Sequence, residues 1–118
     1  MKKHDAVAAL AALAQVNRLA VFRLLVEAGP EGIPAGSVAS AVGLAPNTLT
    51  FHLDRLRGAG LITVRREGRS MIYAAQFGTM NALLGYLTEN CCQGISGACA
   101  PAPVCKPVRS SRSAKISA

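Results

Sequence analysis

The sequence predicts a mainly α-helical domain with one small β-hairpin. Apolar residues recur at helical spacing over residues 1–60 and again over 77–92, whereas residues 61–75 alternate in the manner of two short strands. Hydrophobic residues make up 51% of the 118 residues, but the chain has no Trp, three Phe and two Tyr. The core must therefore be built from Ala, Leu, Val and Ile, which favours closely packed helices.

Two helices are predicted in the N-terminal part of the chain. The Ala-rich run from Ala6 to Ala14 begins near Asp5 and leads directly into a second helix, which stops at Gly29-Pro30. One face of the second helix carries Leu19, Phe22, Leu25 and Val26. No segment reaches the roughly 18 apolar residues that a transmembrane helix needs. We therefore expect no membrane contact and a cytoplasmic protein.

Proline and glycine residues mark the boundaries of the elements that follow. Residues from Ser37 to Val42 predict a short helix, and Pro46 opens another that runs to about Ala59. Gly60 then stands where a left-handed cap residue is expected. The turn Glu67-Gly68 reverses the chain within the hairpin, and a final helix is predicted over 77–92.

The stretch from Val38 to Leu56 has the features of two helices joined by a tight turn. Ala39 is a small residue where the helices must cross closely, and Gly43 adopts positive φ in the turn without steric cost. The apolar residues expected to lock the two helices together are Val38, Val42, Leu44, Leu49, Leu53 and Leu56. A lone hairpin is marginal in water, so the hairpin must pack on these helices. This order of elements is that of a winged helix-turn-helix.

The first and last helices are unusually apolar for so small a body. The last carries a stripe at helical spacing that consists of Phe77, Met80, Leu83, Leu84, Leu87 and Cys91. In a monomer the outer faces of both helices would be exposed apolar patches, so we expect them to form a homodimer interface. The alternative is that both stripes serve only the core of one chain.

The net charge and one helix face favour a nucleic-acid partner. Thirteen Lys and Arg against six Asp and Glu give +7, which suits double-stranded DNA, although a basic solvated surface would have the same composition. The outward residues of the second helix of the pair are Asn47, Thr48, Thr50, Phe51 and Arg55. Their polar groups can bond base edges, and Phe51 can contact a thymine methyl group. The alternative for Asn47 and Thr48 is helix capping.

Basic residues also surround the hairpin turn. Arg65, Arg66 and Arg69 lie close together in sequence, and their mutual repulsion would be offset by a phosphate or by the minor groove. We expect Arg66 and Arg69 to contact DNA, with a purely solvated wing tip as the alternative. His52 lies next to apolar positions and is interpreted as a partly buried structural residue rather than a metal ligand.

Two segments resemble the ArsR family of winged-helix metalloregulators: LAQVNRLAVFRLLVEAG and TFHLDRLRGAGLITVRREGRSMIY. The resemblance covers roughly residues 10–90 and includes the His-Leu pair at His52, the Gly-Leu pair at Gly60 and the Arg-Glu-Gly-Arg wing. Val16 stands where many relatives have proline. The resemblance implies a homodimer that blocks transcription until an inducer, often a metal or metalloid, releases it from operator DNA.

All four cysteines follow residue 90: Cys91, Cys92, Cys99 and Cys105. From Gln93 the chain becomes rich in Gly, Ser, Pro and Ala and then basic, without an acidic residue, so we expect disorder there. The predicted organisation is a DNA-binding and dimerisation domain over 1–92 and a flexible, Cys-containing basic tail over 93–118.

Three of these cysteines could bind a soft ion that takes three sulfur ligands in a pyramidal arrangement. Cys91, Cys92 and Cys99 could converge at the end of the last helix, and three sulfurs without a fourth ligand suit As(III) or Sb(III). Adding Cys105 gives four sulfurs at a spacing that is poor for zinc. An arsenic-responsive subgroup of the family carries its ligands in a resembling place, after a run similar to that from Tyr86 to Cys92. Other soft metals, a redox switch, inert thiols and a two-thiol site for methylarsenite remain alternatives.

The sequence therefore predicts a metalloid-responsive repressor whose apo dimer leaves its operator when trivalent arsenic or antimony binds the C-terminal thiolates. An enzyme is not expected, because His4 and His52 lack plausible catalytic partners in the sequence and no glycine-rich phosphate loop occurs.

Overall fold

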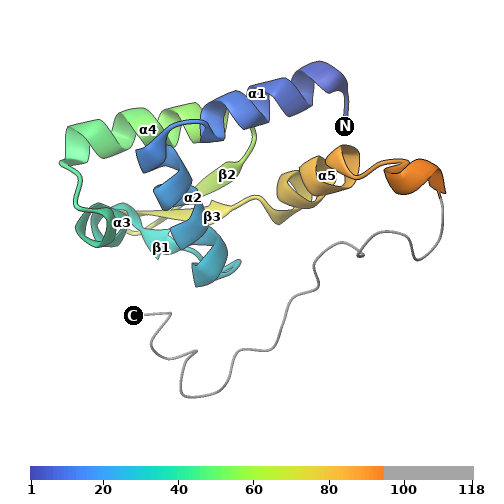
Figure 1. Cartoon of the computed structure of the whole chain (residues 1–118). Helices are drawn as coiled ribbons and strands as arrows, with labels where there is room; N and C mark the ends of the chain where they lie inside the picture. Colours follow the sequence, from blue (N-terminus) through green and yellow to red (C-terminus); the bar gives the residue numbers. More distant parts are fainter. Residues whose placement is uncertain (95–118) are drawn as a thin grey trace, which may run out of the picture.

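The computed structural model describes residues 1–94 and is mostly helical with a small antiparallel sheet, which confirms the predicted winged helix-turn-helix (Figure 1). In chain order the elements are α1 (Lys3–Leu13), α2 (Val16–Ala28), β1 (Ile33–Pro34), α3 (Ala35–Val42), α4 (Pro46–Gly58), β2 (Ile62–Glu67), β3 (Ser70–Ala75), α5 (Phe77–Leu87) and the 3-10 helix η1 (Cys91–Gly94).

A third strand, absent from the sequence prediction, extends the hairpin. β1 pairs antiparallel with β3 through Ile33↔Tyr73 and Pro34↔Ile72, so the sheet order is β1-β3-β2. Two residues, one of them proline, show no periodicity that a sequence could reveal. Gly32 precedes the strand at φ +75°, and a Cβ there would lie 2.4 Å from the Tyr73 carbonyl oxygen. Glycine is therefore required where β1 meets β3.

The helix-turn-helix is held to the core by one face of each of its helices. Gly43 is left-handed at φ 71°, and its N–H donates to the Ala39 carbonyl at 2.9 Å. The buried residues that join α3 and α4 to α2 and the sheet are Val38, Leu49, Leu53 and Leu56, with Val42 and Leu44 packed against them. This packing fixes which side of α4 faces outward.

Element boundaries differ slightly from those predicted. α3 begins at Ala35 rather than Ser37, and α4 ends at Gly58 rather than near Ala59. Gly60 has φ 76°, as its predicted cap role requires. Glu67 is the last residue of β2, so the turn of the hairpin lies one residue further along than predicted, at Gly68 and Arg69.

α1 and α2 meet at a bend of 102° near Gln15. The Gln15 side chain accepts a hydrogen bond from the backbone N–H of Arg18 at 2.9 Å and so caps α2. α1 packs through its alanines, of which Ala6, Ala9 and Ala12 are buried. Within residues 1–94 no individual helix has the length and apolar character to cross a membrane; only the sharply bent α1–α2 pair passes such a test, on length and composition alone.

α5 is shorter than predicted, which corrects the expected helix over 77–92. It ends at Leu87, and the chain then turns before η1. Thr88 donates its hydroxyl to the Leu84 carbonyl at 2.9 Å, and Asn90 adopts a left-handed φ of 58°, which does not continue a helix. Cys91 therefore lies in η1 rather than on the apolar stripe of α5.

Candidate functional site

The outward face of α4 carries all five residues predicted to read DNA. Burial of Leu49, His52, Leu53 and Leu56 turns the opposite side of the helix to solvent. The predicted residues Asn47, Thr48, Thr50, Phe51 and Arg55 are exposed there. The helix thus presents a continuous surface of amide, hydroxyl, aromatic and guanidinium groups. Such groups can bond or contact base edges.

The structure does not support helix capping as the role of Asn47 and Thr48. The N-cap residue of α4 is Ala45, which has no side-chain cap hydrogen bond, and Pro46 occupies the first turn. Asn47 and Thr48 lie inside the first turn with exposed side chains. Their polar groups are consequently directed to the surface of the helix.

Two contacts position the side chains of Thr50, Phe51 and Arg55 on the outward face of α4. The Thr50 hydroxyl donates to the Pro46 carbonyl at 2.9 Å, which leaves the hydroxyl oxygen as an acceptor. Phe51 is 51% exposed, and the Arg55 guanidinium carbon lies 5.0 Å from its ring centroid. Arg55 therefore lies over an aromatic face, as in a cation–π pair.

The wing arginines are not equivalent. Arg65 donates to the Glu67 carboxylate at 2.6 Å and to the Glu31 carbonyl at 2.8 Å, so its charge is already compensated. Arg66 makes one longer contact, to the Gly68 carbonyl at 3.2 Å, and Arg69 is exposed in the turn. Arg66 and Arg69 are thus better placed than Arg65 to meet a phosphate.

His52 is buried in the middle of α4, at 6% exposure. Its Nδ1 lies 3.3 Å from Nη1 of Arg18, whose Nε donates to the Ala12 carbonyl at 2.7 Å. Burial, and then the neighbouring Arg18 charge, lower the pKa of His52 below its usual value. Arg18 is not among the site residues predicted from the sequence. Its position on the buried stripe of α2, four residues before Phe22 and seven before Leu25, was the signal that it needed a partner.

Sequence reasoning also missed two charged residues on the outer side of α4. Asp54 and Arg57 are exposed and lie 3.6 Å apart in an i,i+3 ion pair. Arg57 adds a positive charge in the last turn of the helix, where it complements the helix dipole.

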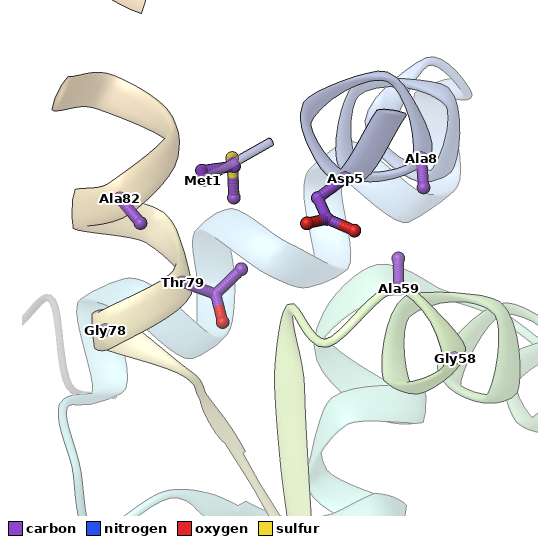
Figure 2. Close-up of a pocket in the computed structure, with 8 residues that line it drawn as sticks. All are labelled: Met1, Asp5, Ala8, Gly58, Ala59, Gly78, Thr79 and Ala82. Carbon is purple, nitrogen blue, oxygen red and sulfur yellow. The ribbon is translucent and has the colours of Figure 1, made fainter. Parts of the chain in front are cut away.

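α1, α4 and α5 meet around a hollow of about 410 Å³ that is lined mostly by small residues, together with Met1 and Asp5. Figure 2 shows Asp5 of α1, Ala59 after α4 and Thr79 of α5 facing this space, with Gly58 and Gly78 at its edge. Met1 is the largest side chain that lines this space, and the rest of the lining is mostly Ala, Gly and Thr.

Cys91 and Cys92 begin η1, and this short helix follows α5 at the opposite end of the molecule from the start of α4 (Figure 1). Their sulfurs lie 3.7 Å apart; Cys91 is exposed, Cys92 is half-buried, and Cys92 has a positive φ of 54°. One soft ion bonded to both sulfurs at about 2.3 Å could bridge any span below about 4.6 Å, so the pair fits a shared ion. Cys99 and Cys105 lie outside the described residues. In residues 1–94 no group of three His, Cys, Asp or Glu side chains is close enough to hold a metal ion.

Large apolar side chains remain exposed on α1 and α5. Val7 and Leu10 are 59% and 42% exposed on α1, and Leu84 and Leu87 are 41% and 55% exposed on α5. Leu84 also borders an apolar groove of about 360 Å³ between α2 and α5. These faces are available for contact with another molecule.

Comparison with known proteins agrees with this geometry. Residues 13–65 match the helix-turn-helix domain family. The HTH-type transcriptional regulator YgaV of Escherichia coli strain K12 is 30% identical over 88 residues, which cover 75% of this chain and 87% of that protein. The nodulation protein NolR of Rhizobium meliloti is 31% identical over 80 residues, or 68% of this chain, and the match spans 63% of NolR.

A solved structure shares the fold over most of the chain. It is a homodimeric winged helix-turn-helix DNA-binding domain from Mycobacterium bovis, with a TM-score of 0.58 and 25% identity over 79% of this chain and 86% of that one. The chain belongs to the family of winged helix-turn-helix transcriptional regulators, and the Mycobacterium bovis domain that shares its fold is described as a possible ArsR-family regulator.

Proposed function

We propose that the protein is a homodimeric repressor that binds operator DNA through α4 and the wing, and that trivalent arsenic or antimony bound to its C-terminal thiolates releases it. The observation that carries DNA binding is the exposed face of α4 together with Arg66 and Arg69 at the wing. Reading residues on a helix and cations on an adjacent hairpin suit a major groove and its flanking phosphates.

Dimerisation is supported by the exposed apolar side chains of α1 and α5. A two-fold axis beside these helices would bury Leu84 and Leu87 of both copies in one self-complementary interface. It would also place two α4 helices for successive major grooves of an inverted repeat. The homodimeric Mycobacterium bovis domain provides a precedent for this assembly.

Inducer binding is supported by the sulfurs of Cys91 and Cys92 at 3.7 Å. Thiolates are soft ligands that favour soft ions, and a third sulfur from Cys99 would complete a pyramidal As(III) or Sb(III) site. Cys91 and Cys92 would hold the ion, and the ion would tie η1 to the segment that carries Cys99.

Coupling to DNA is supported by the hollow between α1, α4 and α5. A change at the end of α5 can shift this helix with little loss of packing on this side, because the residues that line the hollow are mostly Ala, Gly and Thr. Such a shift would change the spacing of the two α4 helices. Allosteric coupling of typical strength would weaken operator affinity about 5- to 150-fold.

The test is operator binding measured by fluorescence anisotropy. The probe is a labelled duplex selected by the protein from a random pool, compared with a shuffled duplex. Parallel titrations use arsenite, methylarsenite, antimonite, zinc and cadmium. We expect arsenite and antimonite to release the protein, whereas zinc and cadmium act weakly. Release by diamide but not by arsenite would instead identify a redox-responsive regulator.

A two-thiol site is the second candidate, because vicinal Cys91 and Cys92 are already close together. Methylarsenite carries a methyl group on one arsenic valence and needs only two sulfurs. A regulator of this kind would respond to methylarsenite at lower concentrations than to arsenite in the same titration.

The wing arginines should contribute to affinity in a salt-dependent way. Arg66→Ala and Arg69→Ala should each weaken binding to operator and shuffled duplexes alike, and each should reduce the slope of log affinity against log salt by about one. Arg65→Ala is the matched control, since Arg65 is already held by Glu67 and the Glu31 carbonyl. Wild-type slopes in both test variants would show that the wing is not a phosphate clamp.

A further inference from the structure

We propose that Arg18 and His52 form a positioning pair that sets the angle of α4 against the α1–α2 junction and so determines how well α4 fits its operator. The inference rests on the proposed function, because it assigns these residues a role in operator recognition. Neither side chain is placed on the DNA surface. Both would act through the helix that carries the reading residues.

Arg18 connects three helices at one point. Its backbone N–H is bonded to Gln15 at the start of α2, its Nε to the Ala12 carbonyl in the last turn of α1, and its Nη1 lies 3.3 Å from His52 Nδ1 in α4. A guanidinium has only donors, so Nδ1 must be the acceptor. The ring is then neutral, with its proton on Nε2.

The Arg18–His52 contact lies beside a groove between α1 and α4. A space of about 680 Å³ separates α1 from α4, and α1 lines it only with Ala8, Ala11 and Ala12. Arg18 also lines this groove, beside Phe51 and Arg55 of the reading face. The Arg18–His52 contact is therefore a polar link between α4 and the α1–α2 junction beside a space that the alanines leave open.

His52 directly follows Phe51, a residue of the outward face of α4 that we expect to read DNA. The rings of Phe51 and His52 are 5.5 Å apart in an edge-on arrangement, and Arg55 lies over Phe51 at 5.0 Å. A rotation of α4 that breaks the Arg18 contact would move all three side chains together. Sequence discrimination should consequently change more than general affinity for DNA.

Protonation of His52 would oppose this contact. Arg18 of α2 would then face a second cation, and α1 contributes only alanines to the groove. On α4, Arg55 is cationic and the Asp54 carboxylate is paired with Arg57. α3 has no ionisable side chain, and the wing residues of β2, Arg65, Arg66 and Glu67, bond to one another or to the carbonyls of Glu31 and Gly68. The remaining charged residues of α2, Arg23 and Glu27, line grooves on its other sides.

The direction of the pH effect separates this proposal from simple charge attraction. An added positive charge normally strengthens binding to DNA. Loss of the Arg18–His52 contact should instead lower the preference for the operator over a shuffled duplex as the pH falls through the pKa of His52, which burial and Arg18 hold below the ordinary histidine value of about 6.5. Affinity for the shuffled duplex should hold or rise over the same range.

The experiment measures operator and shuffled-duplex affinities of the full chain from about pH 8 to about pH 5, with circular dichroism at each pH to confirm folding. His52→Asn keeps an acceptor at the δ position but cannot titrate, so it should retain the preference at high pH and lose its acid decline. His52→Leu has no acceptor and should lose about tenfold in preference at every pH. His4→Asn, at an exposed histidine, is the matched control and should behave as wild type.

A reciprocal variant keeps the proposal testable if His52→Leu folds poorly. Arg18→Met should cause a similar loss of preference, and combining it with His52→Leu should add little. A wild-type operator preference that stays constant or rises toward acid would overturn the pairing, as would a normal preference in either Arg18→Met or His52→Leu. The proposed function fails separately, if the wild type does not prefer its selected duplex at neutral pH.

Discussion

Leu87→Glu should convert the protein to a monomer that folds but no longer holds its operator. Leu87 is 55% exposed on α5, so the isolated chain can solvate the new carboxylate. In the proposed two-fold interface the same substitution would bury a charge twice, at a cost of several kcal/mol for each copy. We expect the dimer dissociation constant to rise at least about 100-fold. Sedimentation velocity across a dilution series measures it.

The loss of the dimer should be visible on DNA as well. A monomer engages one half-site, so operator affinity should fall by about two to three orders of magnitude. Binding to a duplex with one half-site should change little. Val16→Glu is the control, because Val16 is a 76% exposed apolar residue at the start of α2 and belongs to neither α1 nor α5. An intact Leu87→Glu dimer would contradict the proposed interface.

Removing the thiols should abolish induction and leave DNA binding unchanged. Cys91→Ser and Cys92→Ser should each bind the operator with wild-type affinity, because both residues lie beyond α5 and outside α4 and the wing. Each should lose release by arsenite and by methylarsenite, since a hydroxyl is a poor ligand for a soft ion. Anisotropy with saturating inducer gives a direct readout, in which the wild type loses its DNA and the variants retain it.

Cys99→Ser decides between the two arsenic sites. If three sulfurs bind arsenite, this variant should stop responding to arsenite but still respond to methylarsenite, which needs two sulfurs. Cys105→Ser is the control, because it lies further along the Pro-rich tail and should respond normally. Release of the Cys91, Cys92 and Cys99 triple serine variant by arsenite would remove the C-terminal thiols from the mechanism.

Local signals explain why the helix-turn-helix was predictable. Gly43 needs a positive φ, and Val38, Leu49 and Leu53 mark the buried side of two helices whose spacing follows from helical geometry. Once that side is known, the exposed face of α4 follows from the 3.6-residue period. The residues of this face could therefore be named from sequence, whereas their contacts with DNA stay a prediction.

Features that depend on contacts between residues far apart in the sequence were harder to predict. β1 exists because Gly32 admits the Tyr73 carbonyl, a contact between segments about 40 positions apart. Arg18 and His52 are 34 positions apart, so only the folded chain reveals their pairing. The end of α5 was misplaced because the apolar period continues to Cys91, while the Thr88 hydroxyl and the left-handed Asn90 end the helix. Convergence of Cys91, Cys92 and Cys99 stays a prediction, because the structure places the sulfurs of Cys91 and Cys92 3.7 Å apart and Cys99 lies outside the described residues.

The segment after α5 contributes no fully buried side chain between Thr88 and Cys92. The folded body is thus complete without it, and changes in this segment carry little energetic penalty for the rest of the chain. In the proposed mechanism the segment that binds the inducer can therefore be exchanged while DNA binding is retained. Grafting a segment with a different set of ligands after Leu87 should create biosensors that answer to other ions and still recognise the same promoter.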